Sequence, residues 1–251
     1  MITKLDRLLG ELRVVTDAVA HDVRSPVMRM RVHAERALEA TSIEAARCAI
    51  ERALSEADAI LRITSKALDI SRAEAGLDHE TFTAIDLSEL VQDVSESYAA
   101  IVDAGMIIKA NATPKLFVRG DRQMLAQIVS NLIDNVLRHA VEGGVCRIKV
   151  DSIGGQVRLI VTDRGPGIPP AHREEALRRF SKLSRSRSTG GAGLGLPLVA
   201  ALTRLHQGDV LLEDENPGLR VVICLPGFRS PGLPHTGSSG TKRVDEREPV
   251  I

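Results

Sequence analysis

The chain has 251 residues, of which 43% are hydrophobic, enough to bury the core of one large domain or of two modest ones. Its 33 basic and 33 acidic residues balance and only 2% of residues are aromatic, so neither attraction to nucleic acid nor a base-stacking surface is expected. The three cysteines are far apart and no apolar run approaches the ~20 residues that span a bilayer, which predicts a globular cytoplasmic protein.

Residues 1–76 carry the apolar spacing of a helical hairpin. Apolar residues recur every three or four positions up to Leu38, and the pattern restarts with Ser42 as an N-cap and ends at Gly76. Pro26 lies inside the first helix, where we expect a kink because its ring removes a backbone hydrogen bond. Two helices with narrow apolar seams cannot shield both faces alone, so we expect a homodimer that forms a four-helix bundle.

One histidine of this hairpin has neighbours that suggest chemistry. The His21 imidazole, with an unperturbed pKa of ~6.5, is mostly neutral at cytoplasmic pH, and its free ring nitrogen can attack a phosphorus atom. The Asp22 carboxylate can accept a hydrogen bond from Nδ1–H, which leaves Nε2 as the nucleophile. We therefore predict that His21 accepts a phosphoryl group. Five other histidines are interpreted as structural: His33, His79, His172, His206 and His235.

Residues 77–228 change to alternating strands and helices. Strands are predicted at 81–85, 106–110 and 116–119, and helices at 87–104 and 122–141. Two further pairs of strands are predicted at 146–151 with 157–162, which turn at Gly154-Gly155, and at 209–213 with 219–225. These elements predict a mixed, mostly antiparallel sheet with helices on one face. Residues 229–251 lack apolar periodicity, and we expect them to be disordered.

Two asparagines on the helix predicted at 122–141 form the first of three patterns that point to a nucleotide. Asp121 stands where the N-cap is expected, and Asn131 and Asn135 are four residues apart, so they share one face. Amide oxygens on one face can hold Mg²⁺ and its phosphate ligands. An asparagine pair by itself is more often a capping or solvated feature.

The second pattern is a carboxylate at the end of an apolar strand. Asp163 is followed by Gly165 and Gly167, whose turn lets the backbone approach a flat ligand closely. The Asp163 carboxylate can accept a hydrogen bond from the exocyclic amine of adenine. Taken alone, this sequence is also typical of an ordinary turn after a strand.

The third pattern is a glycine cluster that opens an apolar helix at 194–205. The amides of Gly191, Gly193 and Gly195, together with the helix N-terminus, can form a nest for a phosphate chain. A Rossmann fingerprint is the competing interpretation, but a basic, serine-rich segment precedes Gly191 where that motif requires a strand. We interpret residues 168–190 as a mobile lid over the nucleotide, with Phe180 packing its base.

The three patterns in this order resemble the ATP-binding domain shared by sensor histidine kinases, gyrase-type ATPases and heat-shock chaperone ATPases, and the segment 21–26 resembles the phosphoacceptor box of the sensor histidine kinases. The resemblance covers roughly nine tenths of the chain. It implies an α/β sandwich in which Asn135 binds Mg²⁺, Asn131 and Arg138 lie near the phosphates of ATP, and Asp163 binds adenine. The further positions assigned to the nucleotide are His139, Gly165, Gly167, Phe180, Arg185, Gly191, Gly193, Leu194 and Gly195.

The function that this resemblance implies is autophosphorylation of His21 by ATP and relay of the phosphoryl group to an aspartate of a separate response-regulator receiver domain. Most relatives carry Thr or Asn four residues after the histidine, where the side chain orients a water for dephosphorylation; here this residue is Ser25. One rival function is ATP hydrolysis, but those relatives carry a glutamate base where this chain has Asn131. Another rival is a non-catalytic, nucleotide-gated scaffold, although the ATP-contacting positions are intact.

A segment of about 20 residues precedes the proposed acceptor, which is too short for a sensory domain. We therefore expect one of two arrangements. Either Met1 begins the cytoplasmic portion of an inner-membrane receptor, or a separate protein senses the stimulus in trans.

Overall fold

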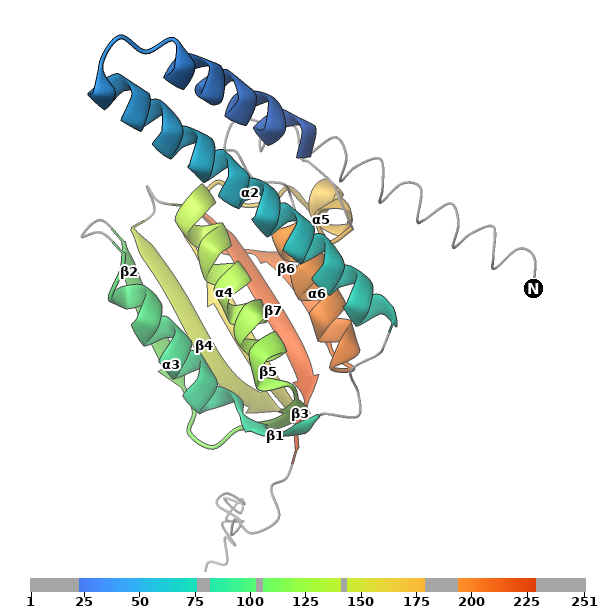
Figure 1. Ribbon diagram of the computed structural model, residues 1–251. Coiled ribbons are helices and arrows are strands. Elements are labelled where there is room, and N and C mark those ends of the chain that lie inside the picture. The colour runs from blue at the N-terminus through green and yellow to red at the C-terminus, as the bar shows by residue number, and fades with distance from the viewer. Residues whose placement is uncertain (1–22, 76–81, 103–105, 141–143, 179–193, 229–251) are drawn as a thin grey trace, which may run out of the picture.

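The computed structural model describes five stretches of the chain, in which a helical hairpin precedes a sheet covered by helices (Figure 1). The described residues are 23–75, 82–102, 106–140, 144–178 and 194–228. The tail for which disorder is predicted lies outside these ranges. Among the helices that they contain, none combines the length and the hydropathy needed to cross a membrane.

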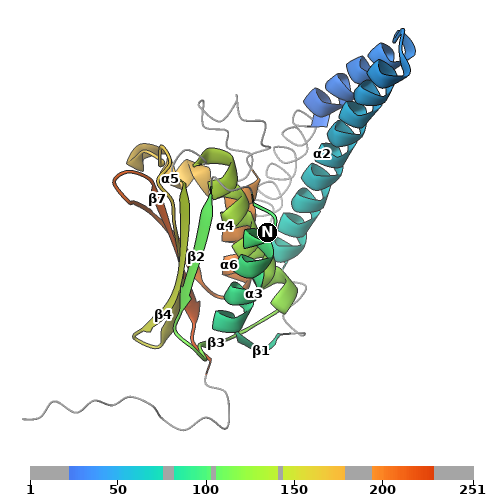
Figure 2. The ribbon, with the colours of Figure 1, turned by 90° about the vertical axis from the view of Figure 1, so that its left-hand side faces the viewer.

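The hairpin consists of the helical residues 23–38 and the long helix α2 (Ile43–Ala75), which run side by side (Figure 1, Figure 2). The Ser42 hydroxyl accepts a hydrogen bond from Ala45 N at 3.2 Å, which confirms the predicted N-cap. The guanidinium of Arg29 joins the two helices by donating to both carboxylate oxygens of Glu56, at 2.8 and 2.9 Å. Pro26 is buried within this hairpin, and the kink expected there involves residues before 23, outside the described range.

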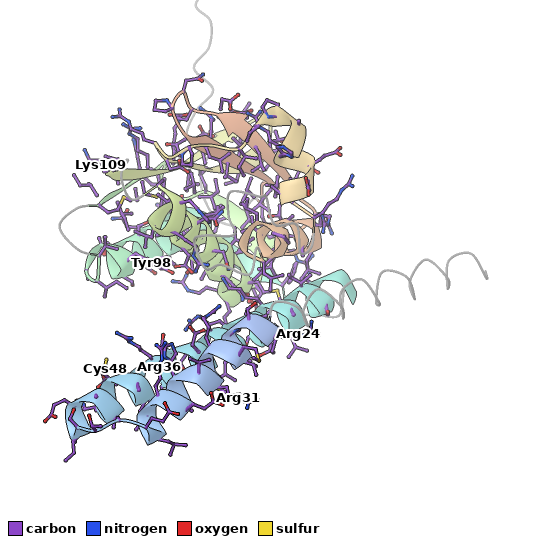
Figure 3. The ribbon with its side chains drawn as sticks, turned by 90° about the horizontal axis from the view of Figure 1, so that it is seen from above. Arg24, Arg31, Arg36, Cys48, Tyr98 and Lys109 are labelled. Carbon is purple, nitrogen blue, oxygen red and sulfur yellow. The ribbon has the colours of Figure 1, made fainter. Side chains whose placement is uncertain are left out.

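Figure 3 shows the hairpin projecting beyond the sheet-containing part of the molecule. Arg31, Arg36 and Cys48 lie on the projecting part, whereas Tyr98 and Lys109 lie on the part that contains the sheet. The other end of α2 packs on that part, and there Ile70 and Ala73 are buried in the same hydrophobic core as the helices on the sheet. The C-terminal half of α2 is therefore fixed to the structure that follows it.

A five-stranded sheet forms the back of this structure. Its strands, in spatial order, are β2 (Ile107–Ala112), β4 (Val145–Ile153), β5 (Gln156–Thr162), β7 (Leu219–Pro226) and β6 (Asp209–Asp214). Only the β2–β4 pair is parallel among these neighbours, which confirms the predicted mixed, mostly antiparallel sheet. The β4–β5 hairpin turns at Gly154 and Gly155, with φ values of 59° and 84° that side chains disfavour.

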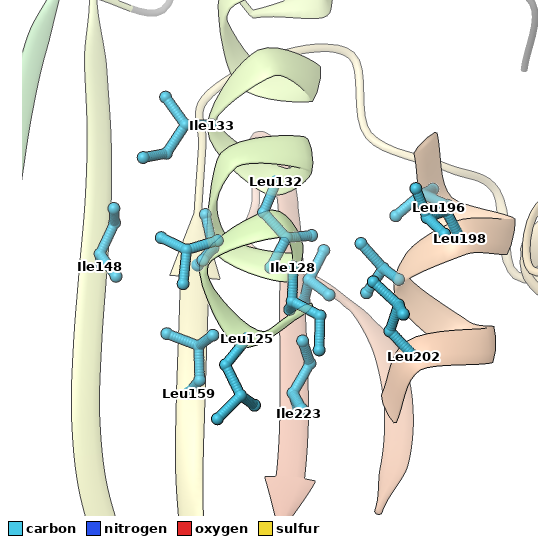
Figure 4. Close-up of a cluster of buried hydrophobic side chains, with 14 of the residues drawn as sticks. Leu125, Ile128, Leu132, Ile133, Ile148, Leu159, Leu196, Leu198, Leu202 and Ile223 are labelled. Carbon is cyan, nitrogen blue, oxygen red and sulfur yellow. The ribbon is translucent and has the colours of Figure 1, made fainter. Parts of the chain in front are cut away.

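Three helices cover one face of the sheet, as predicted (Figure 2). They are α3 (Leu87–Ala99), α4 (Arg122–His139) and α6 (Gly195–Leu205). Leu132 of α4, Leu159 of β5 and Leu198 of α6 are at most 1% exposed and meet in the core between the two layers (Figure 4). This aliphatic packing fits a chain with almost no aromatic residues, because leucine, isoleucine and valine fill the space between the layers.

Two features of the fold are not anticipated by the sequence analysis. Helix α5 (Pro170–Ala176) occupies part of the segment that was predicted to be a mobile lid, and Pro170 starts it because proline is favoured in a first helical turn. Seven residues are too few to show a helical period, so the sequence pattern did not reveal α5. The second element is a pairing of β1 (Thr83–Asp86) with β3 (Phe117–Gly120), which lie far apart in sequence.

Candidate functional site

The two asparagines of α4 lie beside the start of α6. Asp121 Oδ1 caps α4 by accepting from Met124 N at 2.9 Å, as predicted. A Cβ placed on Gly195 would lie 3.7 Å from Asn135 Oδ1 and 3.9 Å from Asn131 Oδ1. The fold therefore brings the first residue of α6 against both amide oxygens, so the first and third sequence patterns meet in space.

Asn131 is almost completely buried, at 5% exposure, and both ends of its side-chain amide are bonded. Its Nδ2 donates to the backbone oxygen of Gln127 at 2.7 Å, and its Oδ1 accepts from Lys66 Nζ at 2.6 Å. Lys66 lies on α2, so the hairpin reaches directly into this cluster. The sequence analysis did not identify Lys66, because no local pattern links it to a residue 65 positions later.

The Asp163 carboxylate, which follows β5, organises the second part of the site. Its Oδ1 accepts from Gly165 N at 2.7 Å and from Leu219 N at 3.2 Å. Among the described residues, the hydrogen bonds to this carboxylate all end on Oδ1. Oδ2 is therefore available to accept from a ligand, as an interaction with an adenine amine requires.

The last turn of α4 connects these two parts. A Cβ on Gly165 would lie 2.8 Å from Ala140 Cβ and 3.1 Å from His139 O, so the turn after Asp163 packs closely on the end of the helix. The side chains of His139 and Arg138 are only partly covered there. Partial burial and the neighbouring Arg138 guanidinium lower the pKa of His139, while the Asp163 carboxylate acts in the opposite direction. Asn131 and Asn135 thus lie along α4, and the turn after Asp163 lies at the C-terminal end of the same helix.

Backbone contacts of two glycines shape the turn around Asp163. Gly218 has a φ of 126°, and a Cβ there would lie 1.9 Å from Asp163 O. Gly167 has a φ of 64°, and a Cβ there would lie 2.8 Å from Gly218 O. The role predicted for Gly167 in a tight turn agrees with this geometry. Gly218 lies between the strands predicted at 209–213 and 219–225, and no local pattern links it to Asp163.

Gly218→Ala is expected to destabilise the fold by more than about 2 kcal/mol, because the added methyl group overlaps a carbonyl oxygen that cannot move freely. The midpoint of chemical denaturation measures this loss. Gly154→Ala is the matched control, since Gly154 also has a positive φ of 59° but a Cβ there meets nothing within 4 Å. Equal losses of stability in the two variants would contradict the proposed overlap.

Several of the residues assigned to the site lie outside the described ranges: His21, Asp22, Phe180, Arg185, Gly191 and Gly193. Ser25 is exposed within the helical residues 23–38. Leu194, which precedes α6, is only 2% exposed and packs in the hydrophobic core. The assignment of these residues to catalysis or to nucleotide binding stays a prediction.

The donor set suits a phosphate-bound magnesium ion better than a metal held by the protein alone. Within the described stretches, no group of three or more His, Cys, Asp or Glu side chains converges on a point. The amide oxygen of Asn135 faces the start of α6, where phosphate oxygens and waters can complete an octahedron. This arrangement fits Mg²⁺ that arrives with a nucleotide.

Comparison with protein families identifies two consecutive regions. Residues 11–76 match the His Kinase A (phospho-acceptor) domain, and residues 120–228 match the histidine kinase-, DNA gyrase B-, and HSP90-like ATPase family. The second match contains the asparagine pair, Asp163 and the start of α6. The first contains the hairpin with the predicted acceptor.

Curated relatives and solved structures agree with these matches. The sensor-like histidine kinase SenX3 of Mycobacterium tuberculosis is 30% identical over 84% of this chain and 52% of its own length. The sensor protein kinase PmrB of Pseudomonas aeruginosa is 29% identical over 90% of this chain and 49% of its own length, so the chain spans about half of each relative.

The mycobacterial sensor histidine kinase MprB has a solved structure with a TM-score of 0.52 and 29% identity, covering 59% of this chain and 98% of that one. The histidine kinase ThkA in complex with response regulator protein TrrA has a TM-score of 0.68 at 21% identity, covering 89% of this chain and 64% of that one, which shows a shared fold.

Proposed function

Since the chain belongs to the sensor histidine kinases and carries their phosphoacceptor and ATP-binding domains, we propose that it transfers the γ-phosphoryl group of ATP to His21 and then to a response regulator. One observation carries this proposal. Asn131 and Asn135 of α4 lie beside the start of α6, and the end of the same helix contacts the turn after Asp163. That arrangement offers separate places for phosphates and for adenine.

The chemical roles follow from the donors and acceptors available. Asp163 Oδ2 accepts from the adenine amine, while Oδ1 keeps the turn in place. The amide oxygen of Asn135 would hold Mg²⁺, which would supply neutralisation of charge on the phosphates. The His21 Nε2 lone pair forms a bond to the γ-phosphorus as the bond to the ADP oxygen breaks, and Asp22 holds the Nδ1 proton during this step.

Hydrolysis of ATP is the weaker alternative. A hydrolase of this fold requires a carboxylate base to activate water, whereas this chain has an asparagine at position 131, and an amide cannot accept a proton at neutral pH. Both ends of that amide are also bonded within the protein. Phosphoryl transfer to a protein side chain needs no such base.

Incubation of the chain with γ-labelled ATP and Mg²⁺ tests the proposal. We expect label on the protein that survives base and is lost in acid, because a phosphorus–nitrogen bond has this stability profile. Addition of a receiver domain should then remove the label from the kinase. Protein that binds nucleotide but never acquires acid-labile label would refute the kinase function. The complex between ThkA and TrrA supports the choice of a receiver domain as the partner.

An apolar stripe on α2 supports a homodimer. Ile50, Leu54, Leu61 and Leu68 are each at least 50% exposed, and their spacing places them on one face of the helix. Such a seam on a hairpin is stabilised when a second copy covers it, as in a four-helix bundle. The response-regulator relay and this dimer are parts of the same proposal.

Leu61→Glu is expected to shift the protein from dimer to monomer, because each copy would place a carboxylate in the shared apolar seam. Light scattering coupled to size-exclusion chromatography measures the change, with 27.1 kDa expected for one chain. Arg52→Gln changes the net charge equally on the opposite, exposed face of α2 and should leave the dimer intact. A wild-type monomer at high concentration would contradict the dimer outright.

A further inference from the structure

Lys66 is the side chain through which the hairpin reaches the nucleotide site. Its ammonium donates to Asn131 Oδ1 at 2.6 Å from a half-buried position on α2. Ile70, one turn further along α2, is 1% exposed, so the backbone that carries Lys66 is anchored on the ATP-binding domain. The packing of α2 on the ATP-binding domain therefore fixes the position of the Lys66 ammonium.

The Lys66 ammonium is partly buried among charges of both signs. Burial is the largest cause that lowers the pKa of this ammonium, and the nearby guanidinium groups of Arg138 and Arg62 lower it further. The nearby carboxylates of Asp134 and Asp69 act in the opposite direction, but each already accepts another hydrogen bond. Asp134 Oδ1 accepts from Tyr98 Oη at 2.9 Å, and Asp69 Oδ2 accepts from Gln127 Nε2 at 2.7 Å.

The acceptor that the ammonium does have, Asn131 Oδ1, is neutral. An ammonium has three donors, and among the described residues Asn131 takes one of them. The same oxygen lies next to the start of α6, where Asn135 Oδ1 also points. The two remaining N–H donors of Lys66 thus lie near the N-terminus of α6 and near Asn135, the proposed metal ligand. The negative charge of a phosphate chain complements this ammonium and this helix N-terminus.

We propose that Lys66 is a ligand of the phosphate chain of ATP, supplied to the ATP-binding domain by the phosphoacceptor hairpin. This inference rests on the proposed function of the site. The ammonium adds a phosphate oxygen to its acceptors when nucleotide binds, so bound ATP strengthens the contact between α2 and α4. Nucleotide affinity then depends on a residue that lies outside the ATP-binding domain.

Calorimetric titration of the full chain with a non-hydrolysable ATP analogue and Mg²⁺ tests this role. Lys66→Gln is expected to weaken binding roughly ten- to hundredfold, the effect of losing one charge-assisted hydrogen bond in a partly buried site. Lys66→Arg should recover part of the affinity, because it restores the charge. Arg52→Gln, with the same change in charge on the same helix, should bind like the wild type.

Adenosine separates a phosphate contact from a structural role, since it carries the adenine but no phosphate. Its affinity should be the same for the wild type and for Lys66→Gln. An equal loss for adenosine, an unchanged affinity for the ATP analogue, or tighter binding by Lys66→Gln would each overturn the assignment. Failure of the wild type to bind any nucleotide would instead refute the proposed function.

Discussion

His21→Gln is expected to abolish the acid-labile label while leaving the affinity for ATP unchanged. Glutamine is similar in size, but its amide nitrogen has no free lone pair with which to attack phosphorus. None of the nucleotide contacts proposed above involves His21, so the substitution removes the acceptor and leaves the nucleotide site intact. Label retained after base treatment, measured per chain, reports the result.

His33→Gln is the matched control for this experiment. His33 lies within the helical residues 23–38, and its Nδ1 is buried without a hydrogen-bond partner among the described residues. It is therefore the alternative acceptor that the described part of the hairpin offers. We expect His33→Gln to be labelled like the wild type. The opposite pattern, with label lost from this variant and kept by His21→Gln, would move the acceptor to His33.

Asp163→Asn and Asp163→Ala are expected to weaken ATP binding to different degrees. Asparagine can keep Oδ1 as the acceptor for Gly165 N and Leu219 N, but it presents an amide donor where the carboxylate offered Oδ2. Two donors then oppose each other at the adenine amine, so we expect a loss of about 2 kcal/mol or more in binding free energy with little change in stability. Alanine removes the acceptor for both backbone groups as well, and should also destabilise the fold by about 1–3 kcal/mol.

Calorimetric titration with ATP and chemical denaturation together distinguish these two effects. Asp209→Asn neutralises an exposed carboxylate on β6 and is the control for the change in net charge. If Asp163→Asn binds ATP as tightly as the wild type, the carboxylate does not recognise adenine. In that case the remaining role of Asp163 is to hold the turn against β7.

Sequence patterns predicted those features whose cause is local. The capping side chains of Ser42 and Asp121 bond to backbone groups three residues later, and the turn at Gly154-Gly155 depends on the backbone freedom of those two residues. The alternation within β4 and β5 likewise reflects one buried face. Helix α5 was missed because seven residues do not complete a recognisable period.

The sequence by itself determined the order of the helices and strands other than α5, the shared face of Asn131 and Asn135, and the place of Asp163 at the end of a strand, because each depends on spacing within one element. The tertiary structure alone decided which distant groups complete the site. Lys66 reaches Asn131 from 65 residues away, and Leu219 N reaches Asp163 from 56 residues away. Such contacts depend on how α2 packs on α4 and how β7 pairs with β5. The spacing of residues within one segment does not indicate that packing.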